Sequence, residues 1–127
     1  MGNPPAKFER LFAKAREAGL RLTAHAGEEG PPSYIIDALD ILGVERIDHG
    51  IRCMEDPELV ERLVADRIPL TVCLLSNVRL RAVDTLAHHP LPAMLAAGLT
   101  VSVNPNDPPY SGGTVVDNFH HMRTVFA

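Results

Sequence analysis

The stretch IPLTVCL, from Ile68 to Leu74, decides the fold that this sequence predicts. A nearly continuous apolar run of this kind is typical of a parallel strand that is buried on both faces. Three more candidate strands lie at residues 20–26, 44–48 and 99–103, and helical apolar patterns separate them. Successive strands begin roughly 24 to 31 residues apart, which is the repeat of a βα unit. The sequence therefore predicts an α/β fold with four parallel strands and right-handed crossovers.

The expected helices are apolar stripes that lie between a start signal and a stop signal. The first stripe runs from Phe8 to Ala15, with Asn3 as its expected cap. Asp56 before Pro57 predicts another start, because an acidic cap and a first-turn proline both suit a helix amino terminus. Further helices are expected over residues 33–42, 91–97 and 114–126, the last of them capped by Thr114.

The composition argues against several classes of protein. Lys and Arg number 12 and Asp and Glu 16, so the net charge is −4 and a sequence-blind nucleic-acid binder is not expected. The longest apolar stretch is about eight residues, far below the roughly 20 of a membrane helix. The first five residues lack the features of a signal peptide, and two cysteines make no disulfide scaffold. We expect one cytoplasmic domain over residues 1–127 that binds neither nucleic acid nor a membrane.

Polar residues gather where each predicted strand ends. The four groups are His25 with Glu28, Asp48 with His49, Ser76 with Asn77, and Asn106 with Asp107. The carboxyl ends of parallel strands meet at one edge of a sheet, which is where sites form in α/β folds. Four such groups in succession predict a single site that is assembled from four loops.

The residue types indicate the chemistry of that site. Histidine is a common metal ligand, so His25 is a candidate, and an amide or carboxylate oxygen can complete the coordination. Glu28 is placed to shuttle protons beside the metal. His49 is placed to orient or deprotonate a metal-bound water, and Asp107 to accept a hydrogen bond from a substrate N–H.

Each of these residues also has a simpler interpretation. A lone histidine is more often a core or surface residue than a ligand, and Asp107 before a proline is an ordinary turn residue. The Ser76–Asn77 pair is also consistent with a loop cap. The pairs His88–His89 and His120–His121 are expected at the surface, because adjacent side chains diverge on a helix. The two cysteines are expected to be small buried apolar residues.

Four segments of the chain resemble the metal-dependent adenosine/adenine deaminase family. They are HAGEEGPP (residues 25–32), ERIDHGIRC (45–53), LSN (75–77) and VNPNDPPYSGG (103–113). The GPP after HAGEE is similar to the adenine deaminase branch. The family fold is a (β/α)8 TIM-type barrel, and the resemblance implies that residues 1–127 form its carboxyl-terminal half, barrel strands five to eight.

The resemblance also implies a reaction and a set of roles. The reaction is the hydrolytic deamination of adenine to hypoxanthine and ammonia by a zinc-activated water. His25 is implied as a zinc ligand and Glu28 as the acid that protonates the purine ring nitrogen N1. His49 is implied to position the attacking hydroxide, and Asp107 to hydrogen-bond the purine at N7. Asn106 holds the position of the ligating Asp of the family.

Two departures from the family pattern modify these expectations. The family has a carboxylate where Asn106 offers a neutral oxygen, and its His-x-His pair occurs nowhere in this chain. Zinc binding is therefore expected to be weak and the isolated chain impaired. The alternatives are an adenosine or N6-substituted adenine deaminase, or a non-catalytic truncated remnant or assembly module.

The resemblance also bears on partners of the chain. Beyond its purine substrate, the chain is expected to pair with a missing amino-terminal half or with a second copy of itself. The open face of the half-barrel is expected to be apolar. It would be drawn from residues such as Leu22, Ile47, Val72 and Val101 or from their neighbours, because the sequence does not fix the alternation.

Overall fold

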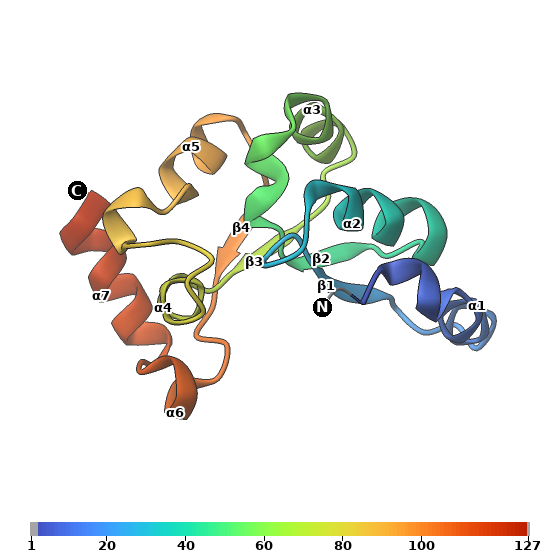
Figure 1. The fold of residues 1–127 in the computed structure, drawn as a ribbon, viewed down its shortest axis with the longest axis horizontal. Coiled ribbons are helices and arrows are strands. Elements are labelled where there is room, and N and C mark those ends of the chain that lie inside the picture. Colours follow the sequence, from blue (N-terminus) through green and yellow to red (C-terminus); the bar gives the residue numbers. More distant parts are fainter. Residues whose placement is uncertain (1–2, 127) are drawn as a thin grey trace.

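The computed structural model describes residues 3–126, so Met1 and Gly2, the first of the five residues that lack signal-peptide features, lie outside it. A single sheet contains β1 (Thr23–Ala26), β2 (Arg46–His49), β3 (Leu70–Val72) and β4 (Val101–Val103), in that order. All neighbouring strands are parallel (Figure 1). This arrangement confirms the predicted α/β fold with four parallel strands, although every strand is shorter than predicted.

Helices connect the strands and extend to both ends of the molecule (Figure 1). The α-helices are α1 (Glu9–Glu17), α2 (Pro32–Asp37), α3 (Pro57–Ala65), α4 (Leu74–Arg79), α5 (Leu91–Ala96), α6 (Pro108–Ser111) and α7 (Val115–Phe126). Shorter segments are the 3-10 helices η1 (Pro5–Phe8), η3 (Ile51–Glu55) and η4 (Leu86–His88), and the π-helix η2 (Ala38–Leu42).

The predicted cap signals have different outcomes in the structure. The Asp56 carboxylate accepts a hydrogen bond from the Leu59 backbone N–H at 3.2 Å, which confirms it as the cap of α3. Thr114 precedes α7 and its Oγ1 accepts from the Asp117 N–H at 3.4 Å, as predicted. Asn3 is not a helix cap: the chain enters η1 through Pro4, and Asn3 instead accepts a hydrogen bond from the Lys7 ammonium.

The third strand region ends earlier than predicted. The strand stops at Val72, and the chain turns into α4 at Leu74, so Ser76 and Asn77 belong to a helix rather than a loop. Both of these polar side chains are buried. The apolar run favoured a longer strand because buried strands and buried helix starts share the same composition, which periodicity cannot separate.

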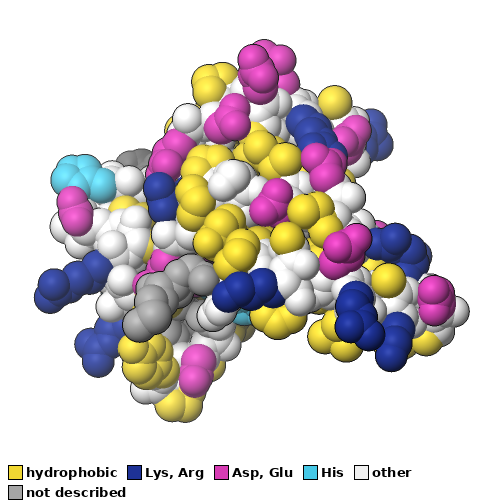
Figure 2. Space-filling view, turned by 45° about the vertical axis from the view of Figure 1, so that its right-hand side comes forward, with side chains coloured by type: hydrophobic (Ala, Val, Ile, Leu, Met, Phe, Trp, Pro, Cys, Tyr) yellow, Lys and Arg dark blue, Asp and Glu magenta, His cyan; other side chains and the backbone are white. Residues whose placement is uncertain are grey.

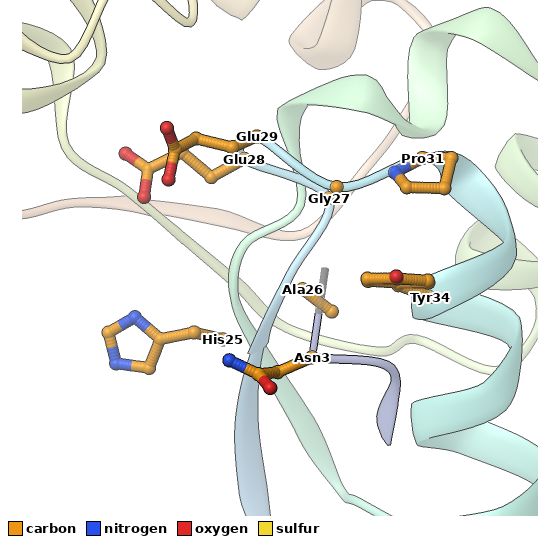
Figure 3. A pocket seen from close by; sticks show the side chains of 9 residues that line it. Asn3, His25, Ala26, Gly27, Glu28, Glu29, Pro31 and Tyr34 are labelled. Carbon is orange, nitrogen blue, oxygen red and sulfur yellow. The ribbon is translucent and has the colours of Figure 1, made fainter. Parts of the chain in front are cut away.

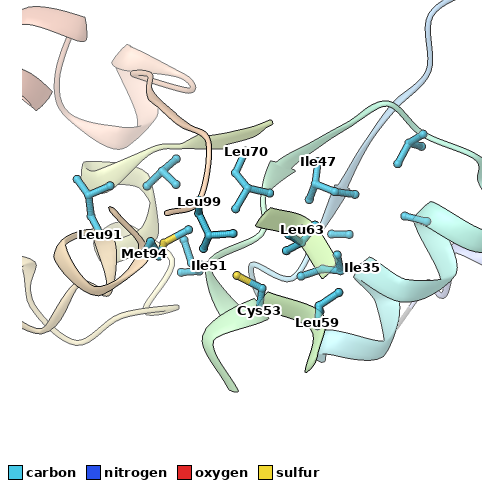
Figure 4. Close-up of a cluster of buried hydrophobic side chains, with 14 of the residues drawn as sticks. Ile35, Ile47, Ile51, Cys53, Leu59, Leu63, Leu70, Leu91, Met94 and Leu99 are labelled. Carbon is cyan, nitrogen blue, oxygen red and sulfur yellow. The ribbon is translucent and has the colours of Figure 1, made fainter. Parts of the chain in front are cut away.

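The core lies between the sheet and the helices that cover one of its faces. Ile47 of β2 and Leu70 of β3 are fully buried there, against Leu63 of α3 and Met94 of α5 (Figure 4). The first helix contributes less than its stripe predicted, because Leu11 is 62% exposed. Its remaining apolar residues Phe12 and Ala15 pack at the edge of the core.

The other face of the sheet carries polar side chains. His25, Asp48, Thr71 and Ser102 are aligned across the four strands, and Thr71 Oγ1 donates a hydrogen bond to Asp48 Oδ1 at 2.7 Å.

The prediction of an apolar open face is therefore wrong. Ile47 and Val72 are completely buried, and they alternate along their strands with the polar row, as does the half-buried Val101. Leu22 is buried just before β1. Successive residues of a strand point to opposite faces of the sheet. A shift of one residue in the assumed alternation therefore exchanges the side chains of the core face with those of the open face.

The surface is mixed in character. On the face shown in Figure 2, acidic and basic side chains are interspersed, and apolar side chains lie between them. Within residues 3–126, no helix combines the length and apolar character needed to cross a membrane.

Candidate functional site

The turn after β1 places two site residues at the carboxyl edge of the sheet. Gly27 has φ +68°, and a Cβ there would lie 2.4 Å from Ile35 Cδ1, so the tight turn requires glycine. The Arg52 backbone N–H donates to the Gly27 carbonyl at 2.9 Å and ties this turn to η3, which follows β2. The chain therefore leaves the sheet abruptly and delivers Glu28 beside His49.

Glu28 and His49 form the closest pair of titratable groups in the site. Glu28 Oε1 lies 3.1 Å from His49 Nδ1, and the imidazole side chain is 2% exposed. Burial raises the pKa of Glu28, while a hydrogen bond from Asn77 opposes the rise. Burial lowers the pKa of His49 to about 4, with His25 adding to the effect. A neutral His49 can donate from Nδ1 to Glu28 and keep Nε2 as a proton acceptor.

His49 also has an unusual backbone conformation. Its φ is +68° and that of Gly50 is +70°, so two consecutive residues are left-handed at the end of β2. Histidine is among the non-glycine residues that tolerate this region, but the conformation still costs free energy. Such strain is typical of functional sites.

His25 lies on the polar face of the sheet and is open to solvent. Its side chain is 69% exposed, with Nε2 3.6 Å from Asp48 Oδ2. Its ring centroid is 5.1 Å from that of His49. A cavity of about 530 Å³ opens here, lined by His25, Glu28 and Tyr34 among others (Figure 3). In this view the His25 ring and the side chains of Glu28 and Glu29 reach one side of the cavity, and Tyr34 lies on the other.

Asn106 and Asp107 lie at the start of α6, and both are exposed. Asn106 has φ +64°, and its Nδ2 donates to Ser76 Oγ at 2.7 Å, which ties this loop to α4 next to Asn77. Within the described residues, the Asp107 carboxylate makes no hydrogen bond to His25, Glu28 or His49. The structure thus brings three of the five predicted residues into one group and places the other two on a neighbouring loop.

Two further residues join the site: Asn77 was expected at the sheet edge without an assigned role, and His89 was not expected there. Asn77 is fully buried, and its Nδ2 donates to Glu28 Oε1 at 2.7 Å. His89 is 3% exposed, so its prediction as a surface residue is wrong. Its Nε2 lies 3.1 Å from Asn77 Oδ1. The one sequence signal for His89 was its position two residues before Leu91, where an apolar helix begins. In the structure, His89 Nδ1 accepts a hydrogen bond from the Leu91 N–H.

The remaining histidine and cysteine predictions can be compared with their burial. His120 and His121 are exposed, as predicted. Cys53 and Cys73 are buried free thiols, also as predicted, and burial raises the pKa of each to about 11.

The donor set is too small for a complete metal site. Among residues 3–126, no three His, Cys, Asp or Glu side chains cluster closely enough to hold a metal ion. A catalytic zinc ordinarily has three protein ligands. His25 and the Asn106 side-chain oxygen would supply two donors at most.

Comparison with known proteins gives a consistent result. The family model described as adenosine deaminase matches residues 1–127. An adenine deaminase from Streptomyces coelicolor is 64% identical over 123 residues, covering 97% of this chain and 36% of that protein. The crystal structure of an adenine deaminase from Arthrobacter aurescens superposes with a TM-score of 0.97 at 70% identity, covering 98% of this chain and 38% of the other.

A second solved structure extends the comparison. An amidohydrolase from Burkhoderia ambifaria, solved with bound zinc, superposes with a TM-score of 0.88 at 35% identity. It is matched over 98% of this chain and 35% of its own length. These likenesses confirm the predicted fold class, parallel βα units of a TIM-type barrel. The chain spans between a third and two fifths of the length of these relatives.

Proposed function

Since this chain belongs to the adenosine deaminase family, we propose that it carries part of the machinery for the hydrolytic deamination of adenine. In that reaction water adds its oxygen to C6, the C6–N6 bond breaks, and hypoxanthine and ammonia leave. The names of the relatives at 64% and 70% identity support adenine as the substrate.

The observation that carries this proposal is the Glu28–His49 pair. A carboxyl group whose pKa is raised by burial touches an imidazole that stays neutral near pH 7. A carboxylic acid with a raised pKa is suited to giving a proton to a ring nitrogen, and a neutral imidazole to holding or accepting one from water. We assign Glu28 as the acid at N1 and His49 as the residue that orients the attacking water.

The loop at β4 supplies the remaining assignments. Asp107 is exposed at the start of α6, which leaves its carboxylate available to a purine N–H or protonated ring nitrogen. We assign it to substrate binding. His25 and Asn106 are assigned as the donors this chain would offer to zinc, which generates hydroxide near neutral pH in such sites. Because these donors fall short of a zinc site, none of the steps above is assigned to the metal.

The incomplete donor set has a consequence for the partners of the chain. We propose that residues 1–127 act as the second half of a barrel, as strands five to eight, and that a complementary amino-terminal segment provides the missing ligands. The coverage of the relatives supports this proposal. The two buried free cysteines are consistent with a reducing compartment, and we propose the cytoplasm.

The test is a chimera in which this chain replaces the matching segment of the Streptomyces coelicolor adenine deaminase. Ammonia release is measured with adenine and with adenosine, and we expect adenine to be the better substrate. Glu28→Gln removes the proton but keeps the shape, so turnover should fall by roughly 10²–10⁴-fold.

Glu29→Gln is the matched control, because Glu29 is exposed and adjacent to Glu28. It should leave turnover within about twofold of the parent chimera. Equal activity of the two variants in folded chimeras would contradict the role of Glu28. Preference for adenosine would contradict the proposal that adenine is the substrate.

A further inference from the structure

His89, Asn77 and Glu28 form a chain of hydrogen bonds that reaches from the core to the site. His89 lies just beyond η4, Asn77 on α4, and Glu28 in the turn after β1. The sequence separations are 12 residues between His89 and Asn77 and 49 between Asn77 and Glu28. Three separate segments of the chain therefore meet at one buried amide.

The direction of these hydrogen bonds follows from the Leu91 backbone. A backbone N–H is only a donor, and that of Leu91 lies 3.0 Å from His89 Nδ1. His89 Nδ1 must therefore be the acceptor, and in a neutral imidazole Nε2 then carries the proton. Burial lowers the pKa of His89 to about 4, so the ring is neutral at physiological pH.

The tautomer of His89 determines the orientation of Asn77. A donor at Nε2 requires the amide oxygen of Asn77, 3.1 Å away, as its acceptor. The amide nitrogen must then face Glu28 Oε1, which lies 2.7 Å from it. The reverse orientation would place an NH2 group against an N–H and an oxygen against a carboxylate, both of which are repulsive.

We propose that His89 is a positioning residue that fixes the Asn77 side-chain amide with its NH2 group on the Glu28 carboxylate. Asn77 Nδ2 and His49 Nδ1 both lie against Oε1, so the other oxygen, Oε2, is left to hold and transfer the proton. This last step rests on the proposed function, whereas the orientation of the amide does not.

The chain offers a pair of variants that separate positioning from packing. His89→Gln keeps a donor near the position of Nε2 and can still face Asn77. His89→Asn keeps an acceptor near the position of Nδ1 for the Leu91 N–H but does not reach Asn77. His88→Asn is the control, because His88 is adjacent and exposed.

The test measures hydrogen exchange of the Asn77 side-chain NH2 by NMR in the 127-residue chain. In His89→Asn, exchange should be roughly fivefold faster than in the parent, the equivalent of one hydrogen bond of about 1 kcal/mol. His89→Gln and His88→Asn should retain the parent rate. The 15N shifts of His89 in the parent should report the tautomer protonated at Nε2.

Unchanged exchange in a folded His89→Asn variant would overturn the proposal, as would a His89 ring protonated at Nδ1. Equal acceleration in the Gln and Asn variants would also overturn it, since that pattern indicates packing alone. These readouts require no turnover. Failure of the proposed deaminase activity is therefore distinguishable from failure of this inference.

Discussion

At the residue scale, the site depends on polar side chains that are buried and carry no charge. His49, Asn77 and His89 are each at most 3% exposed, and each has a hydrogen-bond partner. Burying unpaired polar groups is costly, so these contacts must form together for the fold to be stable. Burial keeps both imidazoles neutral, and the contacts orient the amide toward Glu28.

The neutral state of His89 predicts a dependence of stability on pH. Its pKa is about 4 in the folded chain against 6.5 in the unfolded chain. Between these values only the unfolded state binds the proton, so stability is complete above pH 6.5 and falls as the pH drops toward 4. The shift corresponds to about 3 kcal/mol between pH 8 and pH 4.

Urea unfolding of the parent and of His89→Gln at pH 8 and pH 4 measures this contribution. The variant lacks the titrating group and should lose about 3 kcal/mol less than the parent over this range. His49 titrates in the same direction in both proteins, so the difference isolates His89. A parallel loss in both proteins would mean that His89 is protonated in the folded state.

The site residues differ in how well the sequence predicted them. His25, Glu28 and His49 were expected to meet because parallel strands share their carboxyl edge, and they do. The distinct position of Asn106 and Asp107 was not foreseen, because it depends on the path of the loop after β4. The burial of His89 arises from the packing of η4 against α4, which a local sequence pattern does not encode, and His89 was therefore wrongly placed at the surface.

At the element scale, the sequence predicts the order and type of the main elements better than their limits. The spacing of the apolar runs indicated parallel βα units, and the short 3-10 segments η3 and η4 had no comparable signal. The alternation of β2 and β3 was left open by the sequence, and the structure places Ile47 and Val72 on the buried face. Each strand spans four residues or fewer, too short for a period of two to be read with certainty.

The start of α3 is an element whose stability can be tested directly. Asp56→Ala removes the side-chain acceptor of the Leu59 N–H, and the loss of such a cap costs about 1 kcal/mol. Glu61→Ala removes an exposed carboxylate from the middle of the same helix and should cost less than about 0.5 kcal/mol. Urea unfolding at pH 7 measures both. Equal losses would show that the cap contributes no specific stabilisation.

At the scale of the whole molecule, the open face of the sheet indicates which kind of partner would fit it. A face that carries His25, Asp48 and Thr71 offers hydrogen-bonding groups and metal ligands rather than apolar area. The hydrophobic effect, which scales with apolar area, therefore gives little drive for two copies to close face to face. A segment that brings complementary polar groups and metal ligands is the better match to this face.

The central claim is that this chain holds the proton-transfer half of a deaminase site and lacks the means to complete it alone. The most direct test mixes the 127-residue chain with a separately produced segment of the Streptomyces coelicolor relative, the segment that precedes the part matched by this chain. Ammonia release from adenine is measured in the presence of zinc for each part and for the mixture. We predict that neither part turns over alone and that activity appears in the mixture with a one-to-one stoichiometry. Deamination by the isolated chain at the rate of the mixture, or an inactive one-to-one complex, would contradict the claim.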